Sequence, residues 1–338
     1  MARPPETGRR GRCSLGADHG PVGSQGDTGA AAVEKFLGCQ KRFRPCTERV
    51  GGEMAQNESE RQRWNDEIWA SVWPRREQLT DQVTPLLLEA LALQTGERVL
   101  EVGCGGGKVA LAAASLVGPS GSVVGADLSR PLLALAERRR AELGVTNLSF
   151  AEGDAQVASF TDEPGGKAGA KGGDVGRAGA FDAAMSQFGV MFFDEPVTAF
   201  SNIGAQLVPD GRLCFACWQP LDRNPWFPGV ALAPFVAPPP PPAEGKSAGG
   251  PFAFGDPDRV VEILSAAGFR EISREPHDLV AEAGADAIVD DAQLEYLGVR
   301  SEEMDSARET VDRHVAQFAS VGGTYRFPLA VQIFTARR

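Results

Sequence analysis

The sequence predicts an α/β protein built on a largely parallel sheet with helices on both faces. From residue 98 to residue 218, short apolar segments alternate with helical segments, which is typical of consecutive strand-helix-strand units with right-handed crossovers. A second observation is the glycine-rich stretch at 103–107, which lies between the first apolar segment and a helical run that begins at Lys108. Such a loop commonly binds a ligand at the carboxyl edge of the sheet.

Five buried strands are expected in this region, because each apolar run is short and ends at turn residues. They cover residues 98–102, 122–126, 148–152, 181–186 and 212–218. A helix at 108–116 follows the glycines, and Ser129 with Pro131 opens another helix through a capping serine and an early proline. A helix at 196–207 precedes a turn at 209–211.

Helical patterns also flank this region. Residues 58–93 carry apolar residues at helical spacing and are predicted to form two helices separated near Pro74. Further along, Asp256 and Pro257 mark the start of a helix that ends at Gly268. The remaining expected elements are a strand at 269–273, a helix at 301–318 and a final strand at 328–336.

The chain is predicted to contain one folded core with additions. Residues 1–53 are rich in Gly and Arg and lack apolar periodicity, so we expect a disordered extension, with Met54 as the natural start of the protein. Residues 54–93 are expected to form an N-terminal helical lid, and residues 94–338 the core. Within the core, 162–180 is predicted to be a flexible surface insertion, and 234–251 a proline-rich linker.

Composition favours chemistry on a small molecule. Of the 338 residues, 42% are hydrophobic and the formal net charge is -11, which disfavours the phosphate attraction that nucleic-acid binding requires. No apolar run approaches the roughly 20 residues of a membrane-spanning helix. The N-terminus lacks the apolar segment of a secretory signal, so we expect a cytoplasmic protein.

The six cysteines do not have the density of a disulfide framework, and reduced thiols are expected. Cys214 and Cys217 form a C-x-x-C pattern, but their segment reads as a strand, which points the two side chains to opposite faces. No second cysteine pair of zinc-site spacing accompanies them. A structural role is therefore favoured over a redox or metal role, and no metal site is predicted.

The glycine loop is the first chemistry-bearing feature. Gly103, Gly105 and Gly107 allow a sharp turn and a close approach of backbone amides to a ligand. A dinucleotide-binding loop requires G-x-G-x-x-G, and here the sixth position is Lys108. Glu101 beside the loop repels a diphosphate but suits a ligand that carries ammonium and sulfonium charges. A plain strand-to-helix turn remains the alternative.

Acidic residues stand at the ends of three successive predicted strands. Asp127 ends the second strand, where a carboxylate can accept hydrogen bonds from both hydroxyls of a ribose. Asp154 ends the third strand, where it can accept from an exocyclic adenine amine. Each of them alone could be a helix cap or a turn residue. Together with Glu101 they form a set at the edge where open α/β sheets bind ligands.

Three segments carrying these residues, 99–107, 125–129 and 152–155, resemble successive motifs of the class I S-adenosylmethionine-dependent methyltransferases. Later segments, at 181–193, 207–213 and 255–269, resemble a small-molecule branch akin to the quinone-biosynthesis methyltransferases, and the resemblance runs from about Trp64 to the C-terminus. It implies a doubly wound, seven-stranded, mostly parallel sheet whose last strand, at 328–336, is antiparallel.

The resemblance also implies S-adenosylmethionine as the cofactor and assigns residues to it. The cofactor-binding set comprises Glu101, Gly103, Cys104, Gly105 and Gly107 at the methionine part, Asp127 at the ribose, with Leu128 beside it, and Asp154 with Ala155 at the adenine. Gln187 and Phe188 follow the fourth strand at the junction of cofactor and acceptor. Trp64 and Trp73 match aromatic positions of the family's lid. Together with Phe188, Trp218 and Trp226 they are candidates for an aromatic acceptor pocket, although core packing is at least as good an explanation for Trp218.

The function expected from the resemblance is methyl transfer to a small apolar or aromatic molecule on O, N or C. Displacement at a sulfonium needs no protonated leaving group, so no catalytic base is required. His277 and His314 lie in no recognisable site motif, although a phenolic acceptor would be able to use one of them as a base. The catalytic residues are therefore unknown. Two alternatives stay open: an NAD(P)-dependent oxidoreductase on the same topology, and a non-catalytic S-adenosylmethionine-binding protein.

Overall fold

The computed structural model describes residues 58–161, 181–236, 247, 249–284, 287–288 and 290–338. The predicted extension at 1–53 and the predicted insertion at 162–180 lie outside the described residues. The linker predicted at 234–251 lies mostly outside them.

Seven strands form one sheet in the order β3-β2-β1-β4-β5-β7-β6. They are β1 Arg98–Val102, β2 Ser122–Asp127, β3 Leu148–Glu152, β4 Phe181–Gln187, β5 Leu207–Trp218, β6 Arg270–Ala283 and β7 Tyr325–Arg337. Strands β1 to β5 pair in parallel, whereas β7 runs antiparallel to both of its neighbours, β5 and β6. The predicted mostly parallel sheet with an antiparallel last strand is confirmed.

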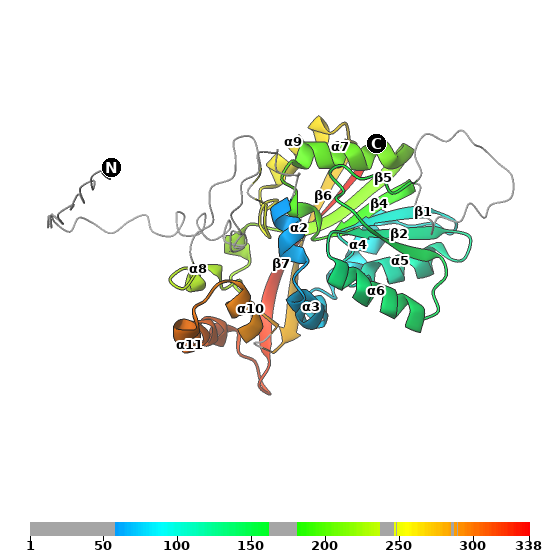
Figure 1. Ribbon diagram of the computed structural model, residues 1–338. Helices are drawn as coiled ribbons and strands as arrows, with labels where there is room; N and C mark the ends of the chain where they lie inside the picture. The colour runs from blue at the N-terminus through cyan, green and yellow to red at the C-terminus, as the bar shows by residue number, and fades with distance from the viewer. Residues whose placement is uncertain (1–57, 162–180, 237–246, 248, 285–286, 289) are drawn as a thin grey trace, which may run out of the picture.

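Helices cover both faces of this sheet (Figure 1). One face carries α4 Val83–Leu91, α5 Lys108–Val117 and α6 Arg130–Glu142; the other carries α7 Pro196–Gln206 and α9 Pro257–Ala266. The predicted cap of α6 is present, because Ser129 Oγ accepts a hydrogen bond of 3.3 Å from the amide of Leu132. None of the described helices is both long and apolar enough to cross a membrane.

The N-terminal region differs from the prediction of two helices separated near Pro74. It contains α2 Glu58–Trp64, α3 Ile68–Leu79 and α4, and Pro74 lies inside α3. The first break occurs instead at Asn65, whose side-chain amide donates to the carbonyls of Arg61 and Leu128. Proline costs a helix one hydrogen bond, and here tertiary contacts of the surrounding helix outweigh that local cost.

The C-terminal half contains longer elements than expected. β6 and β7 were predicted as strands of 269–273 and 328–336, but they form a longer antiparallel pair that extends to Ala283 opposite Tyr325. Two short helices, α8 Gly229–Leu232 and α10 Asp291–Tyr296, were not predicted. The helix expected at 301–318 consists of α11 Met304–Val315 between two 3-10 turns. In Figure 1, α8, α10 and α11 lie together at one side of the molecule.

The predicted turn at 209–211 lies within β5. The strand already begins at Leu207, and its pairing with β4 shifts register between Phe181 and Ala183. Asp210 has a φ of 63°, in the left-handed region where Asp is one of the tolerated residues. The turn is therefore an irregularity of the strand, and not its boundary.

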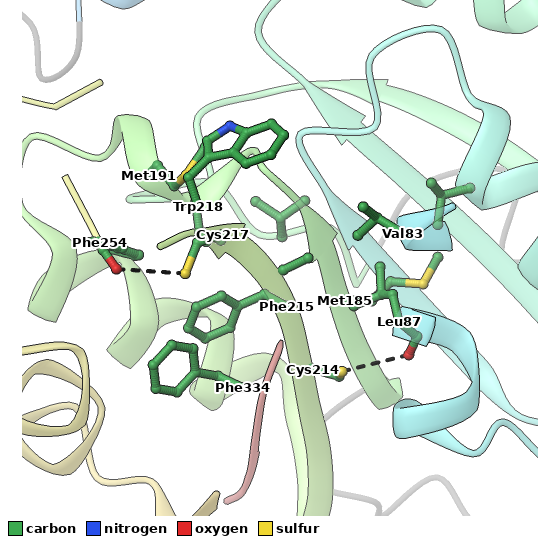
Figure 2. Packing of buried hydrophobic residues seen from close by; sticks show 14 of the residues in the cluster. Val83, Leu87, Met185, Met191, Cys214, Phe215, Cys217, Trp218, Phe254 and Phe334 are labelled. Atoms are coloured by element: carbon green, nitrogen blue, oxygen red, sulfur yellow. Dashed lines mark hydrogen bonds between the residues drawn. The ribbon is translucent and has the colours of Figure 1, made fainter. Parts of the chain in front are cut away.

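Strand β5 passes through the centre of the core, with side chains alternating between the two helical layers (Figure 2). Cys214 donates its thiol to the carbonyl of Leu87 at 3.6 Å, whereas Cys217 points the other way, to the carbonyl of Phe254 at 3.7 Å. Burial raises the pKa of Cys214 to about 12 and also raises that of Cys217. The opposite orientation and the protonated, inert thiols confirm the structural interpretation of the C-x-x-C pattern.

Leu87→Ala should destabilise the protein by about 2–5 kcal/mol, because it leaves a cavity between α4 and β5 where the wild-type side chain is fully buried. The midpoint of urea denaturation measures the effect. Leu116→Ala, the same change at a side chain that is 50% exposed on α5, is the control and should stay within about 0.5 kcal/mol of wild type. Equal effects of both substitutions would contradict the assignment of Leu87 to the core.

Candidate active site

A cavity of about 270 Å³ opens at the carboxyl ends of the parallel strands. The strand order changes direction between β1 and β4, because β1 connects outward to β2 on one side while β4 lies on its other side. The loops after these two strands therefore diverge and leave room for a ligand, as is typical of open α/β sheets. The cavity continues from these strand ends to the N-terminal helices and to the segment after β5.

The glycine loop after β1 is shaped by three residues in the left-handed region. The φ angles of Gly103, Gly105 and Gly107 are 70°, 52° and 79°. The amides of Gly103 and Cys104 donate to the carbonyl of Ala126 at 2.8 and 3.1 Å, which fixes the start of the loop to β2. A Cβ at position 103 would lie 2.8 Å from Gly189 Cα, so the close approach of two loops requires glycine there.

Two carboxylates stand side by side at the ends of β1 and β2. Asp127 accepts hydrogen bonds from the amides of Gly105 at 2.7 Å and Ser129 at 2.8 Å, one on each oxygen. Glu101 is buried, and its Oε2 has no hydrogen-bond partner. Burial raises the pKa of Glu101 well above its ordinary value, and the negative charge of Asp127 raises it further. The pKa of Asp127 is also raised by burial, although its backbone hydrogen bonds oppose the shift.

The third strand end contributes Asp154. Its carboxylate accepts from the backbone amide of Gln156 at 3.0 Å, and it is buried. Asp154 and the following Ala155 line the same cavity as Asp127 and Leu128. Three acidic residues from successive strands thus reach one space.

Aromatic side chains form another part of the cavity wall. Trp64 from α2 lies 4.6 Å from the ring of Trp69 and 5.2 Å from that of Phe192, measured between centroids. Phe188, directly after β4, stacks on Trp218 at 4.4 Å with a φ of 65°, which is unusual for a bulky residue and holds its ring at the cavity. This surface suits a flat apolar ligand.

Most of the residues predicted from the sequence line this one cavity. They are Glu101, Gly103, Cys104, Asp127, Leu128, Asp154, Ala155, Gln187, Trp64, Trp73, Phe188 and Trp226. Gly105 and Gly107 support it from behind. A Cβ at Gly105 would meet Trp73 at 2.5 Å, and one at Gly107, the residue that precedes α5, would meet Ala136 and Phe150 at 2.8 Å. Trp218, left open between pocket and core, is buried and lines the cavity as well.

Glu77 ties the N-terminal helices to the glycine loop. It accepts hydrogen bonds from the indole of Trp73 and from Arg139, both at 2.9 Å. Arg139 also donates to the carbonyl of Gly106 at 2.8 Å. The position of α3 over the cavity is thereby coupled to the loop on which the cofactor site was predicted.

The cysteine and histidine side chains of the described residues are not placed to act as a nucleophile or a base. Burial and the neighbouring charges of Asp127 and Glu101 raise the pKa of the Cys104 thiol well above its usual range. His314 Nε2 lies 3.2 Å from the carbonyl of Trp226, and His277 lies 4.0 Å from Glu275; neither histidine lines the cavity. Among the described residues, no group of three or more His, Cys, Asp or Glu is placed to hold a metal ion.

The sequence did not predict that two arginines, Arg63 and Arg76, line the cavity. The lining residues Trp69, Phe192 and Ile288 were not predicted either. Charged residues on an amphipathic helix ordinarily face solvent, so no pattern distinguished these arginines.

Glu101→Gln should make the protein without added cofactor more stable at high pH. An acid with a raised folded-state pKa holds its proton more tightly when folded, so its burial lowers stability as the pH rises from its ordinary value of 4.5 through the folded-state value. Urea midpoints should therefore favour Glu101→Gln at about pH 8, and the difference should shrink towards about pH 5.

Glu89→Gln, at an exposed position of α4, serves as the control and should show no such pH-dependent difference. A constant difference between Glu101→Gln and wild type across this pH range would show that the buried carboxyl is not protonated as its surroundings require.

Comparison with known proteins agrees with this geometry. Residues 93–224 match a family profile described as a methyltransferase domain. Nocamycin O-methyltransferase of Saccharothrix syringae is 29% identical over 217 residues, which cover 60% of this chain and 70% of that protein. Aklanonic acid methyltransferase DauC of Streptomyces sp. (strain C5) is 32% identical over 134 residues, or 40% of this chain and 53% of that protein.

A quinone-biosynthesis enzyme is also similar. The ubiquinone/menaquinone biosynthesis C-methyltransferase UbiE of Pseudomonas savastanoi pv. phaseolicola is 30% identical over 127 residues, which cover 37% of this chain and 43% of that protein. The chain thus spans about half the length of two of these three relatives. The matched domain contains the glycine loop and all three strand-end acids. Residues 93–224 thus resemble a methyltransferase domain, in agreement with the resemblance of the sequence motifs to methyltransferases.

Proposed function

We propose that the protein transfers the methyl group of S-adenosylmethionine to a small apolar or aromatic acceptor, on O, N or C. The observation that carries this proposal is the continuity of the cavity, in which the acids at the strand ends and the aromatic wall enclose one space. A cofactor on the acids and an acceptor on the aromatic side would then meet without an intervening layer of protein.

The buried carboxylates support a cationic cofactor at the strand ends. The unpartnered Oε2 of Glu101 is an acceptor for the ammonium of the methionine part, and a positive charge there relieves the repulsion between Glu101 and Asp127. The oxygens of Asp127 each keep a further lone pair for the ribose hydroxyls. Asp154 and Ala155 are assigned to the adenine.

The aromatic wall supports a flat acceptor. Trp64, Trp73, Phe188 and Trp226 are the residues we assign to it, and Gln187 lies at the junction, where its Oε1 accepts from Thr84 Oγ1 at 3.0 Å. The net charge of -11 favours a small molecule over a nucleic acid. A cytoplasmic place of action is proposed as well, in keeping with the free thiols of the described cysteines.

The main task of the protein in this reaction is to align the cofactor with the acceptor. S-adenosylmethionine supplies an electrophilic methyl group on a sulfonium, and the leaving thioether needs no proton. The carboxylates fix one reactant, the aromatic wall orients the other, and the N-terminal helices, which we propose act as a lid, exclude water. Because no described histidine lines the cavity, the acceptor atom must be nucleophilic without help from one.

Isothermal titration with S-adenosylhomocysteine, the product form of the cofactor, tests the assignment of the site. Wild-type protein should bind it, and Asp127→Ala should weaken binding by roughly 10- to 100-fold, because two charge-assisted hydrogen bonds are lost. Asp127→Asn separates loss of charge from loss of shape, and Glu137→Ala, an exposed acid on α6, should bind as wild type does. Unchanged affinity in Asp127→Ala would remove the ribose role of this residue.

The activity is tested by release of S-adenosylhomocysteine from S-adenosylmethionine with a panel of aromatic acceptors. Turnover with at least one flat acceptor is expected. Binding of NADH in place of S-adenosylhomocysteine would instead support an oxidoreductase. Cofactor binding without turnover across a broad panel would support a non-catalytic binding protein.

A further inference from the structure

The cavity wall contains one positive charge that the described chain does not neutralise. Three cationic side chains line the cavity: Arg63, Arg76 and Lys108. Arg63 is paired with Glu60 at 3.3 Å, and Lys108 is paired with Asp81. Within the described residues, the guanidinium of Arg76 makes neither a hydrogen bond nor an ion pair, and its Nε is buried without a partner.

Arg76 is held in place by its helix and by an aromatic ring. It lies on α3, and its guanidinium is 5.4 Å from the ring of Trp69, within the range of a cation–π contact. A ring face provides attraction for the cation but no oxygen atom for its N–H donors. A buried charged donor without an acceptor is costly, so its hydrogen-bonding capacity is available to a ligand in the cavity.

The electrostatic surroundings of Arg76 favour an anion. The pKa of Arg76 is lowered to about 10, chiefly by burial and also by the positive charge of Arg63, whereas the negative charge of Asp290 opposes the shift. The carboxylate of Asp290 is paired with Arg75 at 3.1 Å. Arg76 therefore remains charged at neutral pH in a place with too little negative charge.

Arg76 also differs in its surroundings from the acids of the cofactor site. The ring of Trp69, which Arg76 contacts, lies 4.6 Å from the ring of Trp64 between centroids, and Trp64 belongs to the aromatic wall. The contact with Trp69 thus places Arg76 on the aromatic side of the cavity. A ligand group bound there belongs to the acceptor.

We propose that the acceptor is an aromatic anion and that Arg76 binds its carboxylate. The two oxygens of a carboxylate match the fork of a guanidinium, and the flat apolar remainder matches the aromatic wall. This inference rests on the proposed function, because it takes the aromatic part of the cavity as the acceptor site.

Calorimetric titration of the protein saturated with S-adenosylhomocysteine tests the proposal with two probes of nearly equal shape, 2-naphthoate and the neutral 2-naphthamide. Wild type should prefer the naphthoate by about tenfold or more. The preference should disappear in Arg76→Met and be partly kept in Arg76→Lys, which retains the charge. Arg75→Met, at the exposed neighbouring position, should behave as wild type.

The affinity for S-adenosylhomocysteine itself is measured first in each variant. It should change by less than about twofold in Arg76→Met. A loss of about tenfold there, with the naphthoate preference intact, would assign Arg76 to the carboxylate of the cofactor and overturn the proposal. Equal or undetectable binding of both probes to wild type, or a preference that survives Arg76→Met, would overturn it as well. Failure of wild type to bind S-adenosylhomocysteine would contradict the proposed function itself.

Discussion

The repulsion between two buried carboxylates at adjacent strand ends is the constraint on which the site depends. Glu101 is brought beside the end of β2 by the parallel register that sets it opposite Gly125, and Gly125 has no room for a side chain because a Cβ would lie 2.8 Å from Phe150. Asp127, two residues further, then fixes the glycine loop through Gly105. The same contacts that build the loop concentrate negative charge at the strand ends, and a cationic cofactor bound there relieves the repulsion.

The N-terminal helices are connected to the glycine loop and contribute aromatic residues to the cavity. Glu77 connects α3 to Arg139 and, through it, to the glycine loop, so the helix that carries Trp73 and Arg76 is positioned by the cofactor side of the protein. The same cavity thereby contains acids at the strand ends and an arginine, Arg76, beside an aromatic ring. Such an arrangement discriminates by charge as well as by shape, since a ligand placed in the wrong half would leave both charges unpaired.

The sequence was most informative where burial and turn chemistry act together. The bounds of β1 and β3 agree with the prediction, because short apolar runs bounded by glycine or polar turns have few alternatives. β6 was underestimated since it is an edge strand with mostly exposed side chains and a proline, Pro276, at its middle, and such a segment carries little apolar alternation. The helix break predicted near Pro74 was wrong, because tertiary packing outweighed the low helix propensity of proline.

Some residues of the candidate site could be found from the sequence, and others only from the structure. The strand-end acids and the glycine loop are adjacent in sequence to their elements, so a motif locates them. Arg63 and Arg76 acquire their positions only when α2 and α3 fold over the strand ends, and in the sequence they resemble ordinary solvent-facing arginines. Their importance is therefore visible only in the tertiary structure.

Proton release on cofactor binding tests the central claim most directly. Titration of S-adenosylhomocysteine at neutral pH in buffers of different ionisation enthalpy reports the number of protons exchanged. If the ammonium of the ligand is held by Glu101, binding favours the ionised carboxylate and wild type should release protons, whereas Glu101→Gln should release clearly fewer. Equal proton exchange in wild type and Glu101→Gln would contradict the account, because the buried carboxyl would then take no part in holding the ammonium group of the ligand.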